Sequence, residues 1–313
     1  MKISKNLQQK LICPSTKAKL QKKGEYLESV IDSTIRYPII EGIPILIDDE
    51  KSLFKIDGFN QKVNTTFDLK QSKTKKILSR LIPTISANIK AEKNYNKICG
   101  MLPSDSKILI VGGSIKGKGM DAIYSNDSFD IVGSDVSFGT YTTLICDAHD
   151  IPFDDEVFDC VIIQAVLEHV LDPQRCVSEV HRVLKHSGLV YAETPFMQQV
   201  HMKQYDFTRF THLGHRRLFR YFEEISSGPV CGPGMALAWS YSYFLKSFSS
   251  SSIISHLLTV FARMTSFFFK YFDYYLIDKP GSYDAASGLF FMGKKSTNAL
   301  SDRDLIKQFK GIN

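Results

Sequence analysis

This sequence has little that would point to a secreted or membrane-spanning protein. Its six cysteines never occur as CxxC, and several lie in apolar runs, so we expect buried free thiols in a reducing compartment. The first ten residues are polar, so we expect no cleavable signal sequence. A spanning helix needs about 20 apolar residues, whereas the longest uncharged stretch of the aromatic-rich region runs only from Ser247 to Ala262. We therefore expect a cytoplasmic protein.

Charge is unevenly distributed along the chain. The formal net charge is +6. Residues 1–100 hold 19 Lys and Arg against 10 Asp and Glu, and the remaining residues hold 20 against 23. A basic excess can face nucleic acid or an anionic membrane surface. Because these lysines are scattered and lack interleaved aromatic residues, a solvated basic face is favoured over a nucleic-acid site.

The chain is organised around residues 107–135, which read as strand, glycine-rich turn, short helix and second strand. Lys107–Val111 is a short apolar run that ends at two glycines, which is typical of a strand buried on both faces. The four glycines after this strand let the backbone turn sharply and approach a ligand closely. The second run, Asp130–Ser134, ends at Asp135, where a carboxylate can accept both hydroxyls of a ribose. The pattern favours a nucleoside-cofactor site over a glycine loop that only turns the chain.

Strands and helices are expected to alternate after Asp135. A third strand ends at Asp147, so soon after Asp135 that the connection should be a loop rather than a helix. A fourth strand over Val157–Gln164, a helix beginning at Asp172-Pro173 and a fifth strand over Leu189–Ala192 follow. This alternation predicts a doubly wound α/β domain with right-handed crossovers.

Short motifs in the region 107–200 point to a family. They are the Gly112–Gly119 turn, Gly133-Ser134-Asp135, Asp147-Ala148-x-x-Ile151-Pro152-Phe153, Phe158-Asp159, Leu167-Glu168-His169-Val170 and Arg182-Val183-Leu184-Lys185-x-x-Gly188. In combination they resemble the class I S-adenosylmethionine-dependent methyltransferases, in particular the type-11 group. The resemblance implies a Rossmann-like, seven-stranded methyltransferase sheet whose last strand is antiparallel, with Phe222–Ser227 and Gly288–Gly293 as strands six and seven.

The same resemblance implies S-adenosyl-L-methionine as the cofactor. The residues implied to bind it are Gly112, Gly113, Ser114, Gly117, Asp135, Asp147, Ala148, Gln164, Ala165 and His169. Asp135 would hold the ribose and Asp147 the adenine edge. The glycine turn reads GGSIKGKG and therefore departs from the plain GxGxG pattern of the family. The family resemblance assigns this turn to the methionine part of the cofactor.

Residues 1–50 have the pattern of a small β-rich module. Leu11–Pro14 opens it and Tyr37–Leu46 closes it, with prolines that confine these runs to short or edge strands. These residues resemble the small zinc-ribbon-like domain of the tRNA-methyltransferase activator family. A tetrahedral zinc site needs about four N or S ligands, but Cys13 is left without a partner because Thr16 stands where the second cysteine would be. We expect a module that folds without metal and either docks a protein partner or packs on the catalytic domain.

The loop after the fifth strand, Phe196–Leu218, should face the methyl acceptor, because loops at strand carboxyl ends face the ligand in open sheets. His201 is the predicted general base, Asp206 would orient its imidazole, and Arg209 would hold an anionic acceptor. The alternative is a structural network in which Asp206 pairs with Arg209. The spacing of the histidines and carboxylates in this loop fits no established metal-binding pattern, so we expect no metal.

Trp239–Ile277 is rich in Phe and Tyr and poor in charge. We expect an amphipathic helix pair that either covers the active site or makes a peripheral contact with the inner face of the membrane. A lysine-rich helix over Leu69–Leu81 is also expected. The expected organisation is a β-rich domain at 1–50, a helical connector at 51–104, a methyltransferase domain at 105–232, an apolar helical insertion at 233–284, and the last strand with a C-terminal tail at 285–313.

The leading hypothesis is a methyltransferase that acts on an oxygen or nitrogen acceptor. The long insertion and the YDFTRFT loop resemble methyltransferases that act on cell-surface polysaccharides and glycolipids, which implies a small-molecule, glycan or lipid-linked acceptor. The N-terminal module suggests tRNA or protein methylation as the alternative. A catalytically silent scaffold is a third hypothesis, suggested by the irregular glycine turn and the missing zinc ligands.

Overall fold

The computed structural model describes residues 1–60 and 82–312. Its strands are β1 (Leu20–Lys23), β2 (Tyr26–Ser29), β3 (Arg36–Ile40), β4 (Ile43–Leu46), β5 (Lys107–Val111), β6 (Asp130–Asp135), β7 (Leu144–Cys146), β8 (Phe158–Gln164), β9 (Leu184–Pro195), β10 (Phe222–Cys231) and β11 (Gly288–Lys295). Its helices are α1 (Lys5–Gln8), α2 (Ile56–Asn60), α4 (Ala91–Met101), α5 (Asp121–Tyr124), α6 (Pro173–Val183), the 3-10 turn η1 (Lys203–Tyr205), α7 (His212–Leu218), α8 (Pro233–Lys246), α9 (Ser252–Ser266), α10 (Phe269–Leu276), α11 (Pro280–Ala285) and α12 (Asp302–Ile306). The helix predicted over Leu69–Leu81 lies outside the described residues.

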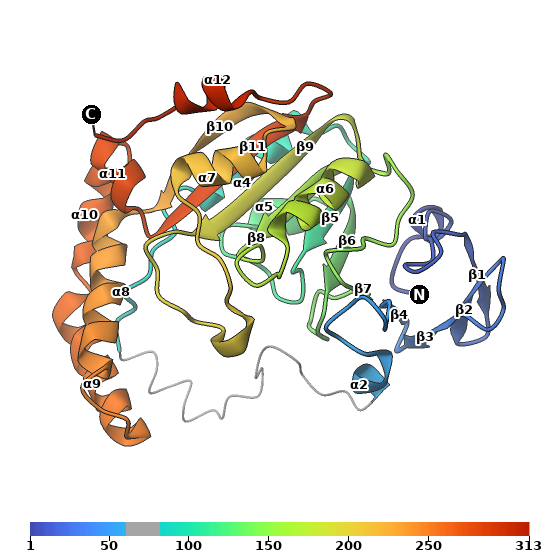
Figure 1. Cartoon of the computed structure of the whole chain (residues 1–313), viewed down its shortest axis with the longest axis horizontal. Coiled ribbons are helices and arrows are strands. Elements are labelled where there is room, and N and C mark those ends of the chain that lie inside the picture. The colour runs from blue at the N-terminus through green and yellow to red at the C-terminus, as the bar shows by residue number, and fades with distance from the viewer. Residues whose placement is uncertain (61–81, 313) are drawn as a thin grey trace.

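The strands form one sheet in the order β1-β2-β3-β4-β7-β6-β5-β8-β9-β11-β10 (Figure 1). The pairs β5–β6, β5–β8, β6–β7 and β8–β9 are parallel, whereas β11 lies antiparallel between β9 and β10. The part from β7 to β10 is the predicted Rossmann-like methyltransferase sheet, and the segments predicted as strands six and seven are β10 and β11. Because β5 is central and both its neighbours are parallel, the carboxyl ends of β5, β6 and β8 meet at one edge.

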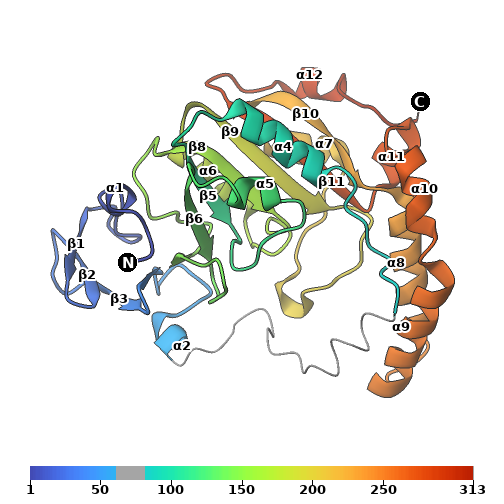
Figure 2. The same ribbon diagram turned by 180° about the vertical axis from the view of Figure 1, so that it is seen from behind.

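The central strands are buried on both faces, as their continuous apolar composition predicted. In β5, Leu109 and Val111 join a core that includes residues of α6 and α7, whereas Ile108 and Ile110 join a second core with residues of α4 and α5. Figure 1 shows α6 and α7 in front of the sheet, and Figure 2 shows α4 and α5 on the opposite side. The result is a three-layer α/β arrangement.

The connections between strands agree with the expectations except at one boundary. The β6–β7 connection contains no helix, as its short length predicted. Helix α6 has Pro173 at its first position, and the Asp172 side chain accepts a hydrogen bond from Arg175 N at 3.0 Å. Strand β9 begins at Leu184, before the predicted Leu189, because Leu184 already pairs with Phe158 of β8.

The N-terminal module continues the sheet of the α/β domain. Ile45 and Leu46 of β4 pair in parallel with Ile145 and Cys146 of β7. Backbone hydrogen bonds from Ile12 N to Pro152 O (3.1 Å) and from Asp154 N to Lys10 O (2.9 Å) add a second contact. The module was expected either to dock a protein partner or to pack on the catalytic domain. The structure shows that it packs on the catalytic domain.

Helices α8, α9 and α10 form a layer at the opposite end of the molecule (Figures 1 and 2), where α8 contacts both other helices. The buried Asp273 of α10 accepts hydrogen bonds from Gly234 N (2.6 Å) and Met235 N (2.8 Å), the first free amides of α8. Among the described residues, none of the helices is by itself long and apolar enough to cross a membrane; only α9 and α10 together reach that length and composition, and they are bent by 48°.

Candidate active site

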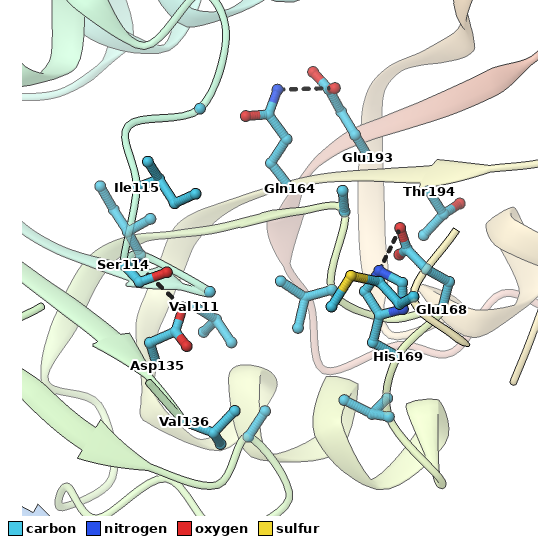
Figure 3. A pocket seen from close by; sticks show the side chains of 18 of the residues that line it. Val111, Ser114, Ile115, Asp135, Val136, Gln164, Glu168, His169, Glu193 and Thr194 are labelled. Carbon is cyan, nitrogen blue, oxygen red and sulfur yellow. Dashed lines mark hydrogen bonds and ion pairs between the residues drawn. The ribbon is translucent and has the colours of Figure 1, made fainter. Parts of the chain in front are cut away.

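A cavity of about 490 Å³ lies at the carboxyl ends of β5, β6, β8 and β9, within the roughly 300–1,000 Å³ typical of small-molecule sites. Figure 3 shows side chains from these strands and the turns that follow them pointing into it. Of the residues predicted to bind the cofactor, all but Gly113 line this cavity. Gly113 instead packs against Gly133, where an added Cβ would lie 3.0 Å from the Gly133 Cα.

The Asp135 carboxylate is held at the cavity wall by two donors. Ser114 N donates to Oδ2 at 3.1 Å, and Ser137 Oγ donates to Oδ1 at 2.7 Å (Figure 3). A carboxylate has about four acceptor sites, so both oxygens keep capacity for a diol. This arrangement fits the predicted ribose contact.

A side chain on either of two glycines of the turn would meet a neighbouring side chain. Gly112 has a φ of +75°, and a Cβ there would lie 2.3 Å from the Val166 Cγ2. At Gly117 an added Cβ would lie 1.8 Å from the Gln164 Oε1. The irregular GGSIKGKG turn therefore brings its bare backbone to the cavity, as a cofactor cradle requires.

Asp147 lies at the other side of the cavity and is bound by residues of two domains. His149 donates to its Oδ1 from both the backbone N (3.0 Å) and Nδ1 (2.6 Å), and Ser52 Oγ donates to its Oδ2 at 2.6 Å. Burial by itself would raise the pKa of Asp147, but the bonds from His149 and Ser52 outweigh it and lower the pKa. Leu53 and Phe54 follow Ser52 into the cavity lining. No local pattern indicates this contribution, because Ser52 and Asp147 lie 95 residues apart in the chain.

Gln164 and Glu193 form a polar group at the ends of β8 and β9. Gln164 Nε2 donates to Glu193 Oε2 at 2.9 Å (Figure 3), and the Tyr191 hydroxyl donates to Oε1 at 2.6 Å. Burial raises the pKa of Glu193, opposed by these bonds. Glu193 was not among the predicted site residues. It could have been predicted in the same way as Asp135, because both are acids near the carboxyl end of a strand.

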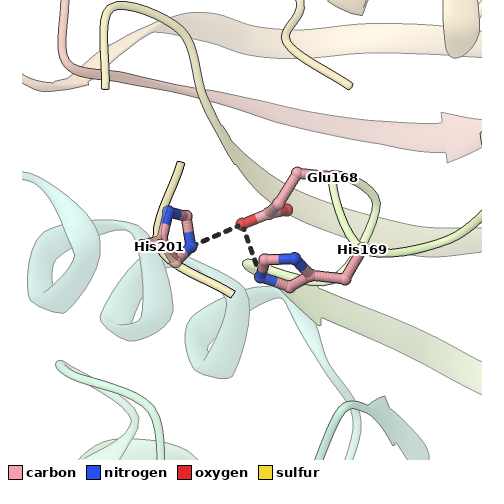
Figure 4. Close-up of side chains that lie close together, drawn as sticks. All are labelled: Glu168, His169 and His201. Carbon is pink, nitrogen blue, oxygen red and sulfur yellow. Dashed lines mark ion pairs between the residues drawn. The ribbon is translucent and has the colours of Figure 1, made fainter. Parts of the chain in front are cut away.

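Glu168, His169 and His201 converge on one point of the cavity wall. Figure 4 shows both imidazoles directed at the Glu168 carboxylate; His169 Nε2 lies 3.6 Å and His201 Nε2 lies 3.9 Å from its Oε1. Burial raises the pKa of Glu168 to about 8 and lowers that of His169 to about 4. The predicted base His201 thus lies next to His169 and Glu168. Glu168 was named in the sequence only as part of a family motif and was not predicted as a site residue.

The Asp206–Arg209 pair is structural, which corrects the expectation that Arg209 holds an anionic acceptor. Arg209 donates to both Asp206 oxygens and to the carbonyls of Gln198, Gln199 and Thr208, which engages all five of its N–H groups. Burial would raise the pKa of Asp206, but Arg209 and the His201 amide hold it well below its ordinary value. Asp206 does position His201, since it accepts from His201 N at 2.8 Å.

Comparison with known proteins gives one family. Residues 130–192 match the family model described as a methyltransferase domain. No curated protein matches the chain at the threshold applied.

Solved structures of similar fold cover about two thirds of the chain. They include phosphoethanolamine N-methyltransferase 2 of Haemonchus contortus (16% identity, 66% of this chain and 53% of that one, TM-score 0.43). Geranyl diphosphate C-methyltransferase of Streptomyces coelicolor is 14% identical (65% and 74%, TM-score 0.42). A complex of the Haloferax volcanii Trm112 methyltransferase activator with a methyltransferase is 17% identical (66% and 90%, TM-score 0.40). These TM-scores are too low for any of the three to inform the substrate of this chain. Together with this match over residues 130–192, the strand order and the cavity around Asp135 support a methyltransferase domain with the class I fold and S-adenosylmethionine as its cofactor.

Proposed function

We propose that this methyltransferase acts on an oxygen or nitrogen nucleophile of a glycan or lipid-linked acceptor. The observation that carries the proposal is the arrangement of the cavity. Asp135 and the glycine turn offer a cofactor site at one part of its wall, and Glu168, His169 and His201 offer proton acceptors at another. A cofactor and a nucleophile bound in one cavity can be aligned for an in-line displacement.

The chain's own residues have three tasks in this reaction. When bound, S-adenosylmethionine supplies an electrophilic methyl group. Asp135 fixes the ribose, and the bare backbone at Gly112 and Gly117 lets the cofactor lie close to the sheet. An acceptor hydroxyl near His201 Nε2 can give up its proton there, because Nδ1 of the same ring lies beside Gln199 O at 3.2 Å and so carries the ring proton.

The helical layer supports the lipid-linked acceptor. Large apolar side chains of α8 to α10 and of the loop between α8 and α9 are half exposed or more: Phe244, Phe248, Ile253, Leu257, Phe261, Met264, Tyr271, Phe272, Tyr274 and Tyr275. We call them the apolar face. Exposed apolar side chains on neighbouring helices favour a membrane or partner contact.

The apolar face is also connected to the loop that lines the cavity. Tyr243 of α8 donates its hydroxyl to Val200 O at 2.6 Å, and Gln199 Nε2 donates to Ser240 Oγ at 3.0 Å. His201 follows directly in this loop. An acceptor drawn from a membrane at the apolar face would thus arrive beside the proposed base.

A methyl-transfer assay tests the proposal. The purified chain is incubated with methyl-labelled cofactor and separate lipid, glycan, RNA and protein fractions. We expect label in the lipid or glycan fraction, and clearly less label with Asp135→Ala when the cofactor is below saturation. Label in RNA or protein would support the alternative acceptors, and failure to bind cofactor by calorimetry would support the silent scaffold.

A further inference from the structure

The Glu168 carboxyl group is buried without a hydrogen-bond partner at the wall of the cavity. The residue is 0% exposed, and neither oxygen has a hydrogen-bond partner among the described residues. Buried carboxylates are normally paired or coordinate a metal, because desolvation is otherwise uncompensated. The two groups that approach it are the imidazoles of His169 and His201 (Figure 4).

Both imidazoles present a lone pair to this carboxylate. His169 Nδ1 lies 2.7 Å from Tyr205 O, so it carries the ring proton and leaves Nε2 bare. His201 Nδ1 lies 3.2 Å from Gln199 O and 3.4 Å from Asp206 Oδ2, which are both acceptors, so its Nε2 is bare as well. Both Nε2 lone pairs therefore face Glu168 Oε1, so the three residues direct three potential ligand atoms toward one point.

We propose that Glu168, His169 and His201 bind a first-row divalent transition metal ion. One ligand atom from each residue lies within 4.8 Å of the others, so small side-chain movements would close them around an ion. Two imidazole nitrogens and one carboxylate oxygen form a ligand set used for zinc, iron and manganese rather than for magnesium or calcium. The carbonyls that hold both Nδ1 atoms are the outer partners that metal-binding histidines require.

The ion would sit where an acceptor can reach it. All three ligands line the cavity, so an acceptor bound in the cavity could reach the ion. This role rests on the proposed function. An acceptor hydroxyl bound there would release its proton to water more readily, and its oxygen lone pair would form the new O–CH₃ bond as the S–CH₃ bond breaks and its electron pair returns to sulfur. With an ion bound, His201 would serve as a ligand, and the proton that His201 accepts in the absence of the ion would pass to water.

Calorimetry on the tag-free full chain, stripped with a chelator, tests the site without cofactor or acceptor. We expect one equivalent of Zn²⁺ or Mn²⁺ to bind and Mg²⁺ not to compete. Glu168→Gln and His201→Ala should each weaken the affinity at least about 100-fold, since even loss of an outer partner costs 10–100-fold. His186→Gln is the control, because His186 is an exposed histidine that does not line the cavity, and this variant should bind the ion as the native chain does.

A second measurement keeps the test decisive if a variant fails to fold. Stoichiometric Co²⁺ added to the native chain should produce visible absorption bands typical of nitrogen and oxygen coordination. Absence of stoichiometric binding, absence of these bands, or unchanged affinity in folded Glu168→Gln and His201→Ala variants would overturn the proposal. Because no methyl transfer is measured, such a failure is separate from failure of the proposed function.

Discussion

At the scale of single residues, Asp135 is the residue predicted to hold the ribose of the cofactor. Hydrogen bonds to a charged group contribute about 1.5–3 kcal/mol, so Asp135→Ala should weaken S-adenosylmethionine binding at least about tenfold, with the fold intact. Titration calorimetry measures this. Asp127→Ala, on an exposed turn, should leave the affinity unchanged. Equal affinity in Asp135→Ala and the native chain would remove Asp135 from the site.

His201 is the residue whose loss should separate binding from turnover. His201→Ala should keep the cofactor affinity and lower turnover by about 10²–10⁴-fold, the usual contribution of a general base. Steady-state kinetics and calorimetry on the same preparation check both. The exposed His186 offers the matched control, since His186→Ala should change neither quantity. A variant that keeps full turnover, or one that melts, would show that the loop is only structural.

His215 should make the protein sensitive to acid. It is buried on α7, and its Nε2 has no partner among the described residues. Burial lowers its pKa to about 3, whereas an unfolded histidine titrates near 6.5. Its contribution is therefore intact above pH 6.5 and is lost as the pH falls toward 3, because only the unfolded chain takes up the proton.

Urea unfolding between pH 7 and pH 5 measures this loss. Stability should fall by up to about 1.4 kcal/mol per pH unit from this residue, and His215→Phe, which cannot titrate, should show a correspondingly shallower dependence on pH. An identical slope in both proteins would contradict the assignment.

At the scale of elements, the apolar face of α8 to α10 is the feature that should control location. Leu257 and Phe261 lie one turn apart on α9 and are more than half exposed. Replacing both with Glu should abolish co-sedimentation with anionic liposomes, because the apolar contact is lost and charge of the wrong sign is added. The control is Ile306→Glu on α12, which is equally exposed but outside this face. If the native chain does not bind liposomes at low salt, these helices serve as a cover for the site instead.

At the scale of the whole molecule, the N-terminal module and the α/β domain share one sheet and one core. The buried Cys13 Sγ contacts the hydroxyls of Ser15 and Tyr37, each at 3.2 Å. These are the contacts of a hydrogen-bonded thiol. They agree with the prediction that the module folds without zinc.

Cys13→Ser tests that prediction, because a hydroxyl can keep the same contacts. The variant should have the circular dichroism, melting temperature and metal content of the native chain, and a chelator should unfold neither. Elemental analysis distinguishes the outcomes. Zinc that is lost with Cys13→Ser, together with the structure of the module, would show that the thiol is a ligand.

Local pattern determined much of this protein. The apolar run before Gly112, the acid at the end of the next strand and the Asp172-Pro173 helix start are set by neighbours along the chain, since burial on both faces of a strand and capping of a helix need only a few adjacent residues. The sheet, the glycine turn and the position of Asp135 could therefore be predicted from the sequence.

Only the tertiary structure decided which distant groups meet. Ser52 donates to Asp147, and Glu168 lies beside His201. No spacing rule connects the members of either pair, because they lie on separate segments whose relative positions are set by packing of the layers. The sequence thus indicated methyl transfer as the reaction. The packing of the loops at one edge of the sheet decided which side chains line the cavity and can take part in that reaction.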